Sequence, residues 1–282
     1  MRAVTAFLLV LVLGFPGCAS QGAKARGEGV NDSQAMTGEL GREIAAGREI
    51  NESILAAFYP YTEPEVVSYV NQIGHSLADH AQRQELPYSF TILYDEKIHA
   101  TSAPGGYVYL TTGMLRFLDN ESELAGVLAH EIAQLQSRDP RLSRLKKVMD
   151  QMTQGAAMAA PLVGQIGAAA MAGLLVMQIL FEAVRPRSEK RGQRADAKAL
   201  GYMVAAGYDP QGLIDVQYRF LEADKALRPY FLDYYQSHPI TQKRFKNLQK
   251  EFANLPLEGK SFTTNREAYQ EATKGIRQMA PQ

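Results

Sequence analysis

The helical pattern between residues 124 and 138 is the feature that most constrains how this chain can fold. Apolar residues recur there every three or four positions, which is the spacing of one face of an α-helix. These residues are Leu124, Leu128, Ile132 and Leu135. The adjoining stripe consists of Val127, His130, Glu131, Gln134 and Arg138. Because a helix turns its apolar face to the core, the pattern predicts a core helix that carries polar side chains along one border.

The motif on this helix reads His130-Glu131-Ile132-Ala133-Gln134, and it differs only in its last residue from the zinc-peptidase signature His-Glu-x-x-His. Residues four apart lie on one face of a helix, so two histidines at that spacing can bind one zinc ion. The glutamate then polarises the metal-bound water. The triplet alone is weak evidence, because short patterns of this kind occur by chance.

The surrounding sequence makes the motif specific. Three blocks carry the resemblance: "SAPGGYVYLTTGMLRFLDNESELAGVLAHEIAQLQSRD" around the motif, "RADAKALGYMVAAGYDP" at 194–210, and "SHPITQKRFKNL", in which His238-Pro239 precedes Arg244. In order and spacing, over roughly residues 40–253, they resemble the HExxH-type (gluzincin) metallopeptidase family that contains the heat-shock protease HtpX, the assembly protease BepA and the CAAX prenyl proteases.

This resemblance implies an α+β fold, a mostly helical, zincin-like metallopeptidase domain with a small antiparallel sheet and an active-site helix. The residues agree, since "YSFTILYD" and "GGYVYLTT" alternate as strands do and Pro104-Gly105-Gly106 forms a turn signal between them. The resemblance also implies that an edge strand binds extended peptide by strand addition. The matching residues are Tyr107, Val108, Tyr109, Leu110 and Thr111.

The resemblance assigns the zinc ligands to two motif histidines and to a glutamate that lies four residues before the aspartate of an Ala-Asp pair. The pair here is Ala195-Asp196, so the glutamate position is Gly192, and the second histidine position is Gln134. Only His130 remains of the three ligands. Zinc sites use three or four nitrogen, sulfur or carboxylate ligands, so we expect no stably bound cofactor.

Other parts of the family site persist in this chain. The resemblance implies that Glu131 is a vestigial general base and that Asp196 is the carboxylate that orients the first histidine. His238 matches a histidine near the cleft. A purely structural interpretation is open for each of them, with an arginine in the former metal space, for which Arg191 or Arg194 is the choice.

An alternative zinc site is chemically acceptable. Glu189 precedes Gly192 by about one helical turn, and His238 could complete a set of His130, Glu189 and His238 with Glu131 still as base. Zinc is the expected cofactor if this alternative holds, and the chain is then an active metalloendopeptidase with rearranged ligands.

The N-terminus predicts a targeting segment. Arg2 is followed by an apolar run, and the single cysteine, Cys18, comes directly after it, as in a bacterial lipoprotein processing site. We expect a signal peptide over residues 1–17, a lipidated flexible tether over 18–36 and a peptidase-like domain over 37–282. An ordinary signal peptide and an uncleaved anchor are the alternatives. The favoured interpretation places the protein in the bacterial cell envelope, as a membrane-anchored lipoprotein that faces the periplasm.

A run without charged residues spans residues 151–181, which is long enough to cross a bilayer. Pro161, Gly164 and Gln165 interrupt it, and alanine and glycine are more frequent in it than leucine. We favour a helix or broken helical hairpin that packs over the domain. A membrane span and lateral contact with lipid are the alternatives.

The sequence therefore predicts a lipoprotein with a metalloendopeptidase fold and a degenerate zinc site. Its expected partners are unfolded or extended polypeptides, in envelope protein assembly or quality control. The 30 basic and 30 acidic residues balance, so no overall charge favours a nucleic acid. We expect an inactive or impaired peptidase. The active enzyme described above and a structural lipoprotein with a filled cleft are the other hypotheses.

Overall fold

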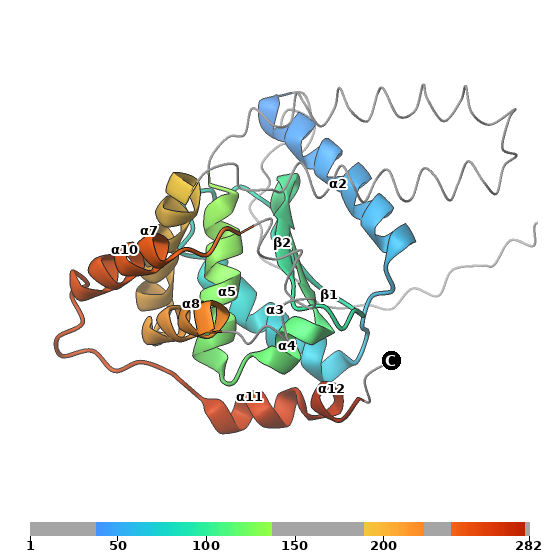
Figure 1. The fold of residues 1–282 in the computed structure, drawn as a ribbon. Coiled ribbons are helices and arrows are strands. Elements are labelled where there is room, and N and C mark those ends of the chain that lie inside the picture. The colour runs from blue at the N-terminus through green and yellow to red at the C-terminus, as the bar shows by residue number, and fades with distance from the viewer. Residues whose placement is uncertain (1–37, 137–188, 223–237, 280–282) are drawn as a thin grey trace, which may run out of the picture.

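A small sheet lies between one long helix and a larger group of helices in the computed structural model of this protein (Figure 1). The structure describes residues 38–136, 189–222 and 238–279. The predictions for the signal peptide, for Cys18 and its tether and for residues 151–181 lie outside these residues. No helix in the described ranges is long and apolar enough to cross a membrane.

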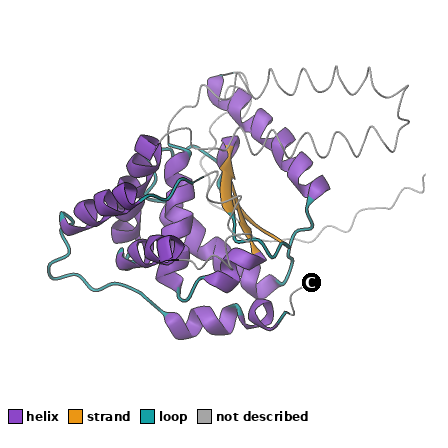
Figure 2. Ribbon diagram, in the orientation of Figure 1, coloured by secondary structure: helices purple, strands orange, loops and turns teal. Residues whose placement is uncertain are grey.

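The three strands lie close together in the sequence, and helices precede and follow them. The first group is α2 (Glu39–Ala57), α3 (Pro64–Ala78), β1 (Ser89–Leu93), β2 (Ala100–Ala103), a short 3-10 turn (Pro104–Gly106), β3 (Tyr107–Thr111), α4 (Thr112–Phe117) and α5 (Glu121–Gln134). The second group is α7 (Glu189–Ala206), α8 (Gln211–Glu222), α10 (Gln242–Ala253), α11 (Arg266–Ala272) and α12 (Lys274–Gln278). The predicted α+β class and its mostly helical character are confirmed (Figure 2).

The sheet is mixed, which corrects the expectation of an antiparallel sheet. Its order is β1-β3-β2, with β3 parallel to β1 and antiparallel to β2. The reason lies in the connections. The Pro104–Gly106 turn, with Gly105 at φ 81° and Gly106 at φ 95°, reverses the chain between β2 and β3. The longer connection after β1 crosses to the far side, so β3 inserts between the two earlier strands.

The strand predicted to bind peptide is therefore not an edge strand. Tyr107 to Thr111 form β3, and both edges of β3 are paired, with Ser89–Leu93 on one side and Ala100–Ala103 on the other. A bound peptide cannot add to a strand whose hydrogen-bonding groups are already used. Among the described strands, β2 is the one at the edge that faces the motif helix α5.

The alternation of β3 sends its side chains into two layers. Val108 and Leu110 join the main core with the residues of α3 and α5. Tyr107 and Tyr109 face α2 instead, where Tyr109 is buried and its hydroxyl donates to Asn51 Oδ1 at 2.9 Å. The sheet is therefore covered on both faces.

A buried ion pair fixes α2 to the rest of the domain. The Arg83 guanidinium donates to both carboxylate oxygens of Glu43, at 2.9 and 2.8 Å, and also to the Leu135 carbonyl just after α5. Gly47 brings α2 into close contact with the turn between β2 and β3, since a Cβ at that position would lie 2.0 Å from the Pro104 carbonyl oxygen. These contacts fix α2 against the turn and the end of α5.

The motif helix α5 is buried on all sides. Every residue from Glu121 to Gln134 is buried, although the sequence pattern predicted one apolar face. Asn120 caps its N-terminus by accepting from the backbone N–H of Glu123. Gly126 allows close contact with the backbone of α8, where a Cβ would lie 3.0 Å from Leu213 Cα. Helices α3, α7 and α8 cover the polar stripe as well as the apolar one.

Candidate active site

The first motif histidine is held by the helix that packs beside it. His130 Nδ1 on α5 lies 2.8 Å from Asp196 Oδ1 on α7, and both residues are buried. A neutral imidazole with its proton on Nδ1 leaves a lone pair on Nε2. The sequence assigned the same orienting role to Asp196, and the structure brings these two residues together.

An arginine lies at the position of the third family ligand. Arg244 on α10 donates from Nε to Asp196 Oδ2 at 2.7 Å and from Nη2 to Oδ1 at 2.8 Å. A Cβ on Gly192 would lie 3.1 Å from the guanidinium carbon. Arg191 and Arg194, the residues chosen from the sequence for the former metal space, are half-buried and exposed, whereas the arginine buried against Gly192 is Arg244.

The charge of Arg244 controls the Asp196 carboxylate. Burial would raise the pKa of Asp196, but the Arg244 guanidinium, its hydrogen bonds and His130 outweigh burial. They hold the pKa of that carboxyl well below its usual range. Asp196 is therefore ionised, and its charge is balanced within the protein.

Gln134 contacts both histidines of the site. Its amide nitrogen lies 3.1 Å from His130 Nε2 and 2.8 Å from His238 Nε2. With the His130 proton on Nδ1, the amide N–H donates to the His130 Nε2 lone pair. The Gln134 amide thus binds His130 and lies against His238 Nε2, whose own N–H is directed to Glu131.

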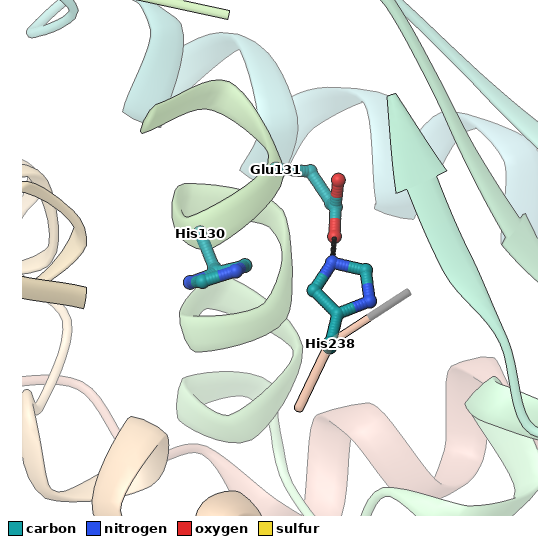
Figure 3. A group of neighbouring side chains, drawn as sticks. All are labelled: His130, Glu131 and His238. Atoms are coloured by element: carbon teal, nitrogen blue, oxygen red, sulfur yellow. Dashed lines mark ion pairs between the residues drawn. The ribbon is translucent and has the colours of Figure 1, made fainter. Parts of the chain in front are cut away.

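Glu131 is engaged on both of its oxygens. Oε1 lies 2.9 Å from His238 Nε2 (Figure 3). Oε2 accepts from the Ser102 hydroxyl at 2.9 Å. Burial would raise the pKa of Glu131, but the charge and hydrogen bond of His238 lower it. Burial also lowers the pKa of His238. Glu131 is therefore an ionised carboxylate with structural partners.

The centre has no exposed surface. The exposed fractions are 2% for His130, 0% for Glu131, 6% for Gln134 and 0% for His238. A peptide carbonyl cannot approach Glu131 in this arrangement without displacing the groups that surround it. The site is thus a closed network of polar side chains.

The structure brings together part of the alternative ligand set. Among the described residues, His130, Glu131 and His238 form a group whose ligand atoms all lie within 4.8 Å of one another. Glu189 lies elsewhere, because its carboxylate accepts from Gln193 and lies 3.7 Å from Lys243 Nζ. Ser102 and Arg244 lie within the blocks that carry the resemblance, but no local sequence pattern marks either of them as part of the site.

A helix bearing His-Glu beside a small sheet, with a carboxylate from a second helix on the histidine, defines a zincin-like metallopeptidase domain. The chain belongs to peptidase family M48, a family of zinc metallopeptidases, whose model matches residues 64–252. The predicted family is therefore confirmed.

Curated relatives agree with this assignment. The chain is 26% identical over 226 residues to the beta-barrel assembly-enhancing protease of Escherichia coli K12. The matched region covers 75% of this chain and 44% of that protein. The chain is 28% identical over 196 residues to the protein of that name from Yersinia pestis, covering 65% and 38%. It is also 24% identical over 203 residues to mitochondrial metalloendopeptidase OMA1 of Schizosaccharomyces pombe, covering 72% and 56%. The chain spans less than half the length of the beta-barrel assembly-enhancing proteases it matches.

Proposed function

We propose that this protein is a non-hydrolytic member of peptidase family M48 that binds extended or unfolded polypeptide in envelope protein assembly or quality control. One observation carries the proposal. The Gln134 amide lies between His130 and His238, where the family has a metal-binding histidine, and it closes a network that uses Glu131 as well.

The residues present do not fit the catalytic zinc of the family. Such an ion needs three protein ligands at about 2.0–2.2 Å and one open position for water. Gln134 offers an amide, Gly192 offers no side chain, and the Arg244 guanidinium lies against Gly192 with its positive charge. A dication is disfavoured beside that charge. We therefore expect no stably bound catalytic zinc and no hydrolysis.

Polypeptide binding is supported by β2, which is an edge strand of the sheet. Thr111 N–H donates to the His99 carbonyl, so the backbone groups of residues 99, 101 and 103 face β3. By the alternation of an antiparallel ladder, Ala100 and Ser102 direct their N–H and C=O groups to the other side. An extended peptide can add there as a further strand once it displaces the residues that cover this edge, because Ala100 and Ser102 are 0% and 7% exposed. The Ser102 side chain contacts Glu131, so the bound peptide runs beside the former catalytic centre.

The cellular setting is part of the same proposal. Two of the relatives are named for the enhancement of β-barrel assembly. The apolar segment and Cys18 support a lipoprotein that is anchored in a membrane and faces the periplasm. Unfolded envelope polypeptides present the extended backbone that the edge of β2 is suited to bind.

The second candidate is an active zinc metalloendopeptidase, and one observation favours it. His130, Glu131 and His238 place three ligand atoms within 4.8 Å of one another. If Glu131 serves as the third ligand, however, it no longer serves as the general base. The cluster therefore supports metal binding more directly than it supports hydrolysis.

Metal content and peptide capture test the proposal together. We expect purified protein to contain little zinc and to leave unfolded polypeptide intact. A photo-crosslinking residue at Thr101 should capture extended peptides, and Ala100→Pro should abolish capture by removing an outward N–H group. Stoichiometric zinc that is lost in His130→Ala would overturn the non-hydrolytic proposal. Absence of capture at Thr101 would remove the binding role.

A further inference from the structure

Charged residues are unequally distributed in this neutral chain. Residues 38–136 contain 5 lysines and arginines but 14 aspartates and glutamates, a net charge of −9 with histidine neutral. Helices α7 and α10 together contain 8 basic and 3 acidic residues, a net charge of +5. The overall balance of charge thus conceals an acidic part, which includes α2 and the sheet, and a basic pair of helices.

The basic residues of α10 form a ridge on its outer side. Arg244, Phe245 and Leu248 are buried. Opposite to them, at helical spacings of three and four, stand three exposed lysines. These are Lys243, Lys246 and Lys250.

Helix α7 continues this surface. Its Lys190 and Arg194 are exposed and one turn apart, on the side opposite the buried Gly192. The two helices lie side by side in Figure 1, and Lys243 of α10 lies 3.7 Å from Glu189 of α7. We call the surface formed by Lys190, Arg194, Lys243, Lys246 and Lys250 the basic face.

An exposed tyrosine lies on helix α8, which packs against α10. Tyr218 is 52% exposed, and its ring centroid lies 6.0 Å from that of Phe245, on the side of α10 away from the lysines. Tyrosine is enriched where protein meets the membrane–water interface, because its ring is apolar and its hydroxyl is polar. Tyr218 thus adds an interfacial side chain near the basic face but not on it, and the lysines carry the case for an anionic surface.

We propose that the basic face docks on a surface of anionic phospholipid. Each lysine or arginine held near such a surface strengthens binding by roughly fivefold, and salt screens the effect. The acidic part of the domain would be repelled by the same surface, so docking also orients the protein. This inference is independent of the proposed polypeptide binding, because it uses none of the residues of β2 or of the closed network.

Vesicle flotation with the full chain tests the docking. The apolar N-terminal segment contributes equally to neutral and anionic vesicles, so the measured quantity is the preference for phosphatidylcholine vesicles that contain phosphatidylglycerol over those that do not. Reversing two charges of the face, in Lys246→Glu with Lys250→Glu, should reduce this preference at least about tenfold. High salt should reduce it in the same way.

A matched control variant carries the same change in net charge elsewhere. Lys260→Glu with Lys274→Glu alters two exposed lysines outside the basic face and should leave the preference nearly unchanged. An equal loss in both pairs would show a net-charge effect and overturn the proposal. So would the absence of any preference in the unaltered chain. If the Lys246→Glu, Lys250→Glu variant still binds the vesicles but no longer binds an acidic polypeptide, the basic face belongs to a protein partner and the proposal is overturned.

Fluorescence reports the orientation, because the chain contains no tryptophan. Asn247→Trp on α10 and Ala56→Trp on α2 each place one tryptophan at an exposed position. Brominated lipid in anionic vesicles should quench the first and not the second. Equal quenching of both, or stronger quenching at position 56, would contradict docking through the basic face.

Discussion

The amide nitrogen of Gln134 lies 3.1 Å from His130 Nε2, the ring nitrogen left over once His130 Nδ1 has bonded to Asp196. In the family arrangement a second histidine stands at position 134. The glutamine therefore engages the remaining imidazole nitrogen with a hydrogen bond. This contact gives the second ring nitrogen of the buried His130 a hydrogen-bond partner.

Rebuilding the ligand set should restore zinc binding. Gln134→His with Gly192→Glu supplies the family's three ligands, and we expect tight zinc binding in the double variant only, because the ligands share one ion. Metal analysis and calorimetry measure it. The new carboxylate would lie next to Arg244, whose guanidinium competes with zinc for it and limits the affinity. Equal zinc affinity in the two single variants would show that the ligand assignment through Gly192 is wrong.

Removal of the Arg244 side chain should destabilise the domain severely. Arg244→Ala leaves the buried Asp196 carboxylate without its cation, which costs about 3–5 kcal/mol. Arg244→Lys should not restore stability, because a lysine cannot make the two parallel hydrogen bonds. The free energy of unfolding in denaturant measures the effect. Lys246→Ala, on the exposed side of the same helix, is the control and should change stability by less than about 0.5 kcal/mol.

Stability should fall in acid through Asp196. Its pKa in the folded protein lies below its ordinary value of 3.8, so the unfolded chain binds more protons in that pH range. The contribution of Asp196 to the free energy of unfolding is therefore complete above pH 3.8. It is lost as the pH falls below 3.8 towards the pKa of Asp196 in the folded protein. Unfolding free energies measured between neutral and acid pH should show a smaller slope in Asp196→Asn. An identical slope in both proteins would contradict the assignment.

The close contact between α2 and the turn before β3 predicts that one added methyl group at Gly47 lowers the stability of the domain strongly. Gly47→Ala places a Cβ 2.0 Å from the Pro104 carbonyl oxygen, so α2 or the turn must move. We expect a destabilisation of more than about 2 kcal/mol and weaker peptide capture at β2. Gly201→Ala on α7 is the control, because no atom lies within 4 Å of its Cβ. That change should stabilise the helix by about 0.5–1 kcal/mol. Thermal unfolding of both variants distinguishes the two outcomes.

Local patterns in the sequence determined much of this protein. The spacing of apolar residues identified the motif helix, and period-two alternation identified β1 and β3. The order of three short blocks identified the family. Gln134 and Gly192 were assigned to ligand positions by counting from neighbouring motif residues, and that assignment stays a prediction. These features depend on residues close together in the chain.

Only the tertiary structure decided the rest, because it depends on contacts between distant segments. Strand order follows from how the connections cross, so β3 became the central strand and β2 an edge strand. The choice of Arg244 over Arg191 and Arg194 follows from the packing of α10 on α7, 48 residues from Asp196 in the chain. The full burial of α5 likewise required three other helices. No local pattern encodes which distant side chain will neutralise a buried carboxylate, since Arg191 and Arg194 are both nearer to Asp196 in the sequence than Arg244 is.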